Sequence, residues 1–160
     1  MVEAHAAVVT RRLTHATGDP NLARDLAQDT FVVAFDRLQT FRGDASLSTW
    51  LHAIAFNLLR DHRKRVRREQ SLWARLRRRP APAVVEPERA LQSREDLERL
   101  QAIVAGLDPA KRDAFVLRVV EQLSLAESAE ILGVRIATVS YRAKRAEALV
   151  REAFEKGASS

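Results

Sequence analysis

The sequence contains no cysteine, so it can form neither a disulfide framework nor a thiolate metal site. Glycine and proline are scarce, with five of each in 160 residues, and alternating β-branched residues are nearly absent. Apolar residues instead recur at helical spacing, which favours an all-α fold. No apolar run approaches the ~18 residues of a membrane-spanning helix, and no basic segment followed by an apolar core opens the chain. We therefore expect a cytoplasmic protein without membrane insertion.

The sequence also lacks the patterns of an enzyme. There is no glycine-rich phosphate loop, no nucleophile–base pairing, and no metal-ligand spacing among His5, His15, His52 and His62. We therefore expect no catalysis, no metal and no cofactor.

Positive charge is in excess. The formal net charge is +6 and the pI is about 10.6, which indicates a polyanionic partner, most often nucleic acid. Residues 65–91 begin with dense arginine and then contain Pro80, Pro82 and Pro87, which disfavour helix. The chain is therefore predicted to form two small helical domains, 1–66 and 91–160, joined by a basic linker over 67–90.

The C-terminal half carries signals of a helix-turn-helix. Asp108 before Pro109 is a helix N-cap followed by a proline at the first helical position. Ser124 and Glu127 have the spacing of a capping box, and Gly133 suits the left-handed turn that ends a helix. Two short helices around a glycine turn are typical of this motif.

The helix that begins near Ile136 has two distinct faces. Its predicted buried stripe is Ile136, Val139, Ala143, Ala146 and Val150. Opposite lie Thr138, Tyr141, Lys144 and Arg145, with Arg142 at the margin. Short polar residues near the start of a helix, followed by cations, fit a helix in the major groove of DNA. Arg135 stands where a capping side chain would be expected.

An acidic and amide strip runs along the helix expected over 21–38. Asp25, Gln28, Asp29 and Asp36 fall within one narrow arc around Val32, and a wider apolar arc fills the rest of the helix. By these residues alone the strip is either a solvated face or a docking surface.

Residues 41–65 are expected to form a loop that leads into a helix. Its inward stripe is Leu47, Leu51, Ile54, Ala55 and Leu58, and another face carries His52, Phe56, Arg60, Arg63 and Lys64, with Trp50 and Asn57 at its edge. Aromatic rings among arginines hold unstacked bases of single-stranded nucleic acid. Alternatively, Phe56 packs on a neighbouring helix and the arginines are merely solvated.

Three segments resemble bacterial RNA polymerase sigma factors of the extracytoplasmic-function (ECF) class: "RDLAQDTFVVAF", "FRGDASLSTWLHAIAFNLLRDHRKR" and "LDPAKRDAFVLRVVEQLSLAESAEILGVRIATVSYRAKRA". They occur in the family's order. The resemblance implies that 1–66 is sigma region 2, a helical bundle, and that 91–160 is sigma region 4. It also implies a transcription initiation factor that brings core RNA polymerase to promoter DNA, and that the linker threads channels of the polymerase.

The resemblance assigns roles to residues. The acidic strip would dock on the polymerase's largest subunit, through Asp25, Gln28, Asp29, Val32 and Asp36. The loop Phe41–Leu47 and the following helix would hold the −10 element as melted single strand, through Phe41, Arg42, Asp44, Trp50, Phe56, Asn57, Arg60, Arg63 and Lys64. The role of Phe56 comes from its chemistry, because the family varies at this position. The −35 element would be read as duplex by Arg135, Thr138, Tyr141, Arg142, Lys144 and Arg145.

Other expectations follow from the same resemblance. Family members are commonly held inactive by an anti-sigma factor, and the free chain is expected to be a monomer. Arg24 replaces the family's more common acidic residue beside the strip, which would weaken or retune docking. The main alternative is a one-component helix-turn-helix repressor, which would be a dimer on a palindromic site. A basic amphipathic helix over 57–79 that lies on a membrane surface is a further alternative.

Overall fold

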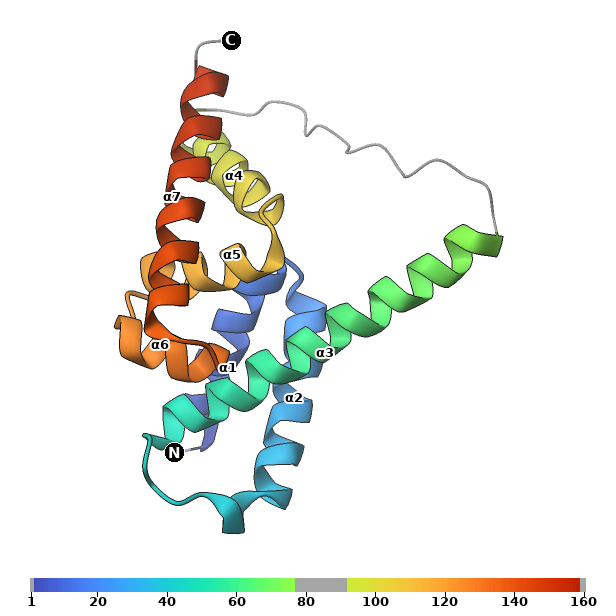
Figure 1. Ribbon diagram of the computed structural model, residues 1–160, viewed down its shortest axis with the longest axis vertical. Helices are drawn as coiled ribbons and strands as arrows, with labels where there is room; N and C mark the ends of the chain where they lie inside the picture. Colours follow the sequence, from blue (N-terminus) through green and yellow to red (C-terminus); the bar gives the residue numbers. More distant parts are fainter. Residues whose placement is uncertain (1, 77–91, 159–160) are drawn as a thin grey trace.

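The computed structural model describes residues 2–76 and 92–158, and within these ranges all regular secondary structure is helical (Figure 1). This confirms the all-α prediction. The N-terminal half consists of α1 (Val2–Thr17), α2 (Pro20–Asp36), the 3₁₀ turn η1 (Leu38–Thr40) and α3 (Leu47–Leu76). The C-terminal half consists of α4 (Gln92–Ala105), α5 (Pro109–Phe115), η2 (Val116–Val120), α6 (Leu125–Leu132) and α7 (Ile136–Ala158).

A tight turn folds α2 back along α1. Gly18 has a φ of +70°, which ends α1, and its N–H donates to the carbonyl of Thr14 at 2.8 Å. The Asp19 side chain then accepts from the first N–H groups of α2, and Pro20 occupies the first helical turn. The buried face of α2 thus meets α1, which leaves the opposite face available to partners.

Helix α3 is longer than the sequence predicted. It continues without a break through residues 67–76, the first part of the predicted linker, and this end of α3 projects away from the rest of the molecule (Figure 1). Arginine, glutamine and leucine are good helix formers, and the prolines that disfavour helix begin only at Pro80, which lies outside the described residues. The domain boundaries at 66 and 91 stay a prediction.

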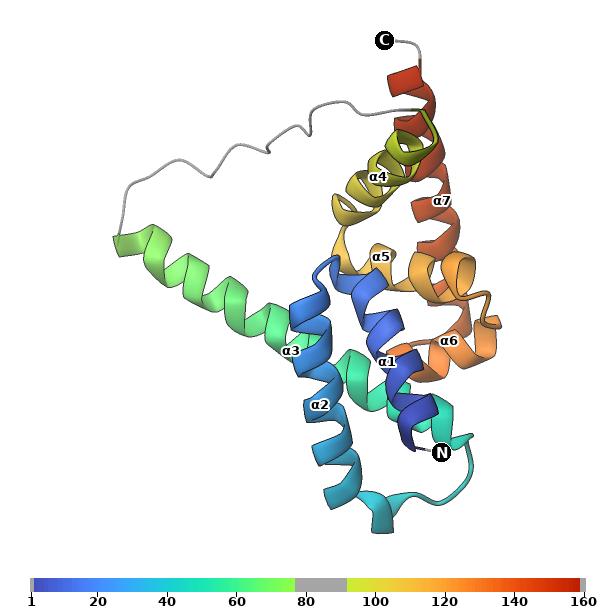
Figure 2. The ribbon, with the colours of Figure 1, turned by 180° about the vertical axis from the view of Figure 1, so that it is seen from behind.

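Helix α5 widens into the π-helical segment η2 before it ends. The N–H of Glu121 donates to the carbonyl of Val116 at 2.9 Å, a bond that spans five residues. The segment ends beside α1 (Figure 2). Glu121, which follows it, accepts a hydrogen bond from Arg11 of α1.

The two halves pack against each other through a shared apolar core. In this core α3 packs on α6, and buried residues of both halves form one cluster that includes Leu51, Phe56, Leu117, Ile131 and Val139. A second, smaller cluster lies within the C-terminal half and comprises Leu107, Phe115, Ala146 and Val150. Across the described ranges, no helix is long and apolar enough to cross a membrane.

Candidate nucleic-acid and protein interfaces

The polar strip of α2 faces outward. Asp25, Gln28 and Asp29 are exposed, and Val32 is 57% exposed among them. The opposite side of the helix is buried by Ala23, Leu26, Ala27, Thr30 and Ala34. The prediction of an outward-facing strip is confirmed; its role is not tested by its exposure.

The strip continues into an apolar groove that sequence reasoning missed. Gln28, Phe31, Val32, Phe35 and Asp36 line this groove, and Phe35 is 79% exposed. A helical wheel places Phe35 next to Gln28, so the signal was present in the sequence. An exposed aromatic ring between amide and acidic groups is typical of a protein-binding surface.

The loop before α3 is held to the helix by an aromatic pair. The rings of Phe41 and Trp50 lie 5.2 Å apart between centroids, with an interplanar angle of 47°. The Ser46 hydroxyl accepts from the N–H of Thr49 at 3.0 Å, which caps the start of α3. Arg42 and Asp44 are exposed in this loop.

The predicted −10 residues of α3 divide into two groups. Asn57 and Arg60 are exposed and hydrogen-bond to each other, and Lys64 is exposed beside Asp61. Phe56, by contrast, is only 4% exposed. It lines, with Ile131 and Leu132 of α6, a cleft of about 360 Å³ between the halves. Of the two interpretations of Phe56, the structure supports packing on a neighbouring helix.

Arg63 also lies at the contact between the halves. Its guanidinium forms an ion pair with Asp113 at 2.7 Å and donates to the carbonyl of Ala16 at 3.0 Å. His52, expected on the same polar face, is fully buried. The polar face expected for α3 is therefore wrong for Phe56, which packs against the C-terminal half, and for His52, which is buried near Arg12 of α1.

The helix-turn-helix has the predicted caps. The side chains and backbones of Ser124 and Glu127 form both bonds of a capping box. Gly133 ends α6 with a φ of +63°. Val139, Ala143, Ala146 and Val150 are buried as predicted, but Ile136 is 51% exposed because it occupies the first turn of α7 at the surface.

The predicted reading face of α7 is accessible. Arg135, Lys144 and Arg145 are exposed, Tyr141 is 67% exposed, and Thr138 is partly exposed. Arg142 differs, because its half-buried side chain lines the cleft between the halves. The face left open to a partner is thus formed by Arg135, Thr138, Tyr141, Lys144 and Arg145.

Both halves match known protein families. Residues 1–69 match the family model described as Sigma-70 region 2, and residues 97–150 match Sigma-70, region 4. Together they cover most of the chain. The chain belongs to the ECF sigma factors. It is a transcription initiation factor, and the helix-turn-helix repressor is not favoured.

Curated relatives of this sigma factor extend over most of its length. The RNA polymerase sigma factor YlaC of Bacillus subtilis is 31% identical over 135 residues, which are 84% of this chain and 78% of the relative. The ECF sigma factor SigW of the same organism is 31% identical over 147 residues, 87% of this chain and 76% of the relative.

Two solved structures resemble this sigma factor over both halves. RpoE in complex with the anti-sigma factor NepR from Bartonella quintana has a TM-score of 0.72 at 22% identity, covering 96% of this chain and 94% of that one. CnrH in complex with the cytosolic domain of CnrY has a TM-score of 0.69 at 25% identity, covering 97% and 85%. The fold of both described halves is therefore shared with these two structures.

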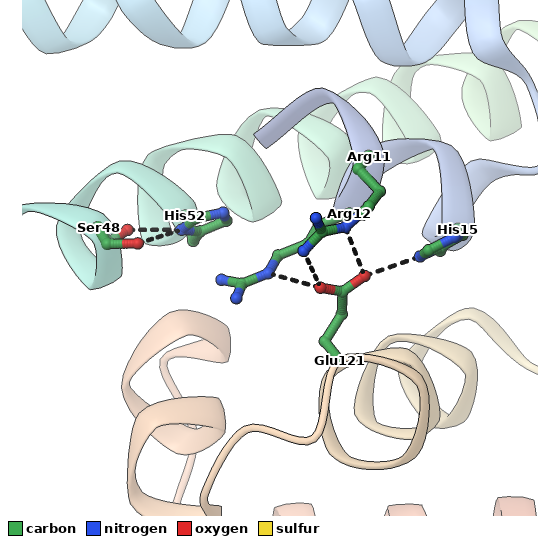
Figure 3. Close-up of polar contacts among 6 residues, drawn as sticks. All are labelled: Arg11, Arg12, His15, Ser48, His52 and Glu121. Atoms are coloured by element: carbon green, nitrogen blue, oxygen red, sulfur yellow. Dashed lines mark hydrogen bonds and ion pairs between the residues drawn. The ribbon is translucent and has the colours of Figure 1, made fainter. Parts of the chain in front are cut away.

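Sequence reasoning did not find the polar cluster that joins the halves of this sigma factor. The Glu121 side chain is 4% exposed and pairs with Arg11 at 2.8 Å, Arg12 at 3.2 Å and His15 at 2.8 Å (Figure 3). Burial acts to raise the pKa of Glu121, but hydrogen bonds from these three side chains outweigh it and lower the pKa to about 2. Glu121 is therefore an anion surrounded by donors from α1.

His52 lies near this cluster and is neutral. Its Nδ1 lies 2.6 Å from the carbonyl of Ser48, so Nδ1 carries the proton, and no hydrogen-bond partner is found for Nε2 among the described residues (Figure 3). Burial, followed by the charge of Arg12, lowers the pKa of His52 to about 4.

Proposed function

We propose that this sigma factor directs core RNA polymerase to promoters through three separate surfaces, one for the polymerase and two for DNA. The observation that carries this proposal is the match of each half to one sigma-70 region. The charges of the exposed surfaces support it, because the surface proposed for the polymerase is acidic and the two proposed for DNA are basic. An acidic and apolar strip on α2 repels DNA, whereas the exposed faces of α3 and α7 are basic and attract it.

The polymerase surface is the α2 strip with its groove. Asp25, Gln28 and Asp29 supply charge and hydrogen-bond acceptors, while Val32 and Phe35 supply apolar area that a partner can bury. Asp36 also lines the groove. Arg24, exposed beside the strip, reduces its negative charge and so tunes the affinity.

The −35 surface is the exposed face of α7. Thr138 and Tyr141, near the start of the helix, reach base edges in the major groove, and Lys144 and Arg145 contact phosphates. Arg135 reaches the backbone from the turn, and Arg142 joins this face only when the cleft between the halves opens.

The −10 surface is the loop 41–47 with the adjoining face of α3. Arg42, Asp44, Asn57, Arg60 and Lys64 are accessible, and the Phe41–Trp50 pair joins the loop to the start of α3. This surface holds the melted strand, whose unpaired bases expose their stacking faces. Phe56 and Arg63 take part only after α5 and α6 of the C-terminal half move away from α3.

Further features of the proposal concern the chain as a whole. Residues 1–66 and 91–160 act as the two domains, and 67–90 connects them. The free chain is a cytoplasmic monomer without enzymatic activity. The similarity to RpoE and CnrH, each solved with a partner protein, supports an anti-sigma factor as a further partner.

The test is association with core RNA polymerase, followed by promoter-dependent run-off transcription. Asp29→Lys should weaken association at least tenfold and leave helicity unchanged, because like charges across an interface cost several kcal/mol. Asp96→Lys, an equal charge reversal at an exposed site of α4, is the matched control and should bind as the wild type does. If the two variants bind core polymerase with equal affinity, the α2 strip is not the polymerase-binding surface. If the wild-type protein gives no run-off product, the proposed function is refuted.

A further inference from the structure

One ion cluster connects the C-terminal half to α1. Arg11, Arg12 and His15 lie on consecutive turns of one helix, and all three point to the single carboxylate of Glu121 (Figure 3). Both carboxylate oxygens are used, since Oε2 meets both arginines and Oε1 meets His15. A buried carboxylate with three cationic or donor partners is a specific contact and not a chance surface pair.

A second polar contact reinforces the same arrangement. Arg63 of α3 pairs with Asp113 of α5 at 2.7 Å, and Arg112 donates to the carbonyl of Ala16 at the end of α1 at 3.4 Å. Phe56 of α3 and the buried residues Ala129, Ile131 and Leu132 of α6 belong to one apolar cluster that also joins the halves. The halves therefore meet through a small apolar core with ion pairs at its edge.

This closed arrangement affects the two DNA surfaces unequally. Tyr141, Lys144 and Arg145 remain exposed. Phe56 is covered and Arg63 is occupied by Asp113. The free chain can therefore present its −35 helix while part of its −10 surface is hidden.

We infer that Glu121 and the basic cluster of α1 form a latch that holds the free sigma factor closed, so that the covered part of its −10 surface, Phe56 and Arg63, opens only when a partner separates the halves. The claim that the latch hides part of the −10 surface rests on the function proposed above. The claim that the latch holds the two halves together is independent of that function. The specific prediction is that loss of one carboxylate charge shifts the equilibrium between closed and open chains.

The experiment measures the separation of the halves in the full chain. The protein has no native cysteine, so Ser71→Cys on α3 and Ala153→Cys on α7, both exposed, can be labelled with a donor and an acceptor dye for single-molecule energy transfer. Glu121→Gln should raise the ratio of open to closed molecules on the order of tenfold, the effect of losing a charged hydrogen bond. Glu152→Gln is the matched control, because its partner Lys156 lies on the same helix, and it should leave the ratio unchanged.

A second variant guards against a folding defect. Arg11 is 54% exposed in its side chain, so Arg11→Gln should not disturb the core, yet it should open the chain in the same direction and by less. Arg151→Gln, at an exposed site of α7, is its control. Wild-type energy transfer in both Glu121→Gln and Arg11→Gln, or a wild-type chain that is already open, would overturn the latch.

A DNA measurement separates this inference from the function on which it rests. The same variants are titrated with a fluorescein-labelled single-stranded DNA of mixed sequence. Opening accompanied by tighter binding supports both the latch and the −10 assignment. Opening without any gain in binding supports the latch and rejects the −10 assignment, whereas tighter binding without opening rejects the latch.

Discussion

Acidification from pH 7 to pH 4 should destabilise the protein through His52. The folded state holds the pKa of His52 at about 4, whereas the unfolded chain has the ordinary value of 6.5. Between these values the unfolded state binds more protons than the folded state, so stability is complete above pH 6.5 and falls as the pH decreases toward 4. A difference of this size corresponds to about 3 kcal/mol at most. The groups facing His52 are Arg12 and His5 of α1, which lower its pKa, and Glu121 after η2, which raises it.

The assay is urea unfolding followed by circular dichroism at intervals from pH 7.5 to pH 4.5. His52→Leu removes the titrating group and the unpaired Nε2, so its unfolding free energy should change much less across this window. His62→Gln, at a site on α3 where His62 accepts from Arg65 of the same helix, is the matched control and should retain the wild-type slope. The reasoning is refuted if His52→Leu loses stability on acidification as steeply as the wild type, since another group would then be responsible.

Three further predictions concern single residues of the C-terminal half. Ser124→Ala removes the capping bond to Glu127 and should lower the unfolding free energy by about 1 kcal/mol, measured by thermal or urea unfolding. Gly133→Ala should cost about 1 kcal/mol, because a side chain is strained at a φ of +63°, whereas Gly106→Ala, where φ is not positive, should be no worse than wild type. When the logarithm of the duplex-binding constant is plotted against the logarithm of the salt concentration, Arg145→Ala should lower the magnitude of the slope by about 0.9. Tyr141→Ala should change the base preference and leave that slope unchanged. Identical salt responses of the two variants would contradict the assigned roles.

The sequence predicted best the features that depend on neighbouring residues. The caps at Asp108, Ser124 and Gly133 are local hydrogen-bond and dihedral requirements, and each is present in the structure. The outward strip of α2 was also predictable, since periodicity separates Asp25 and Asp29 from the buried face.

Features that depend on packing between the halves could not be predicted in this way. Phe56 and His52 looked like members of a polar face because α6, which covers Phe56, is far away in the sequence. Glu121 could not be distinguished from an ordinary surface acid, because its three partners lie more than a hundred residues before it. Helix α3 was predicted to end too early, because the arginine-rich residues 67–76 were assigned to the linker together with the prolines that follow them. Arginine favours helix, and the helix continues through this segment.

The shared core has a thermodynamic consequence. In the closed chain Phe56, Leu117 and Ile131 belong to one apolar cluster, so each half derives part of its stability from the other. The two domains should then unfold in a single cooperative transition while closed, and in two separate transitions once apart. A partner that separates them must bind each half tightly enough to offset the contacts that both lose, and that requirement favours a partner large enough to hold both halves at once.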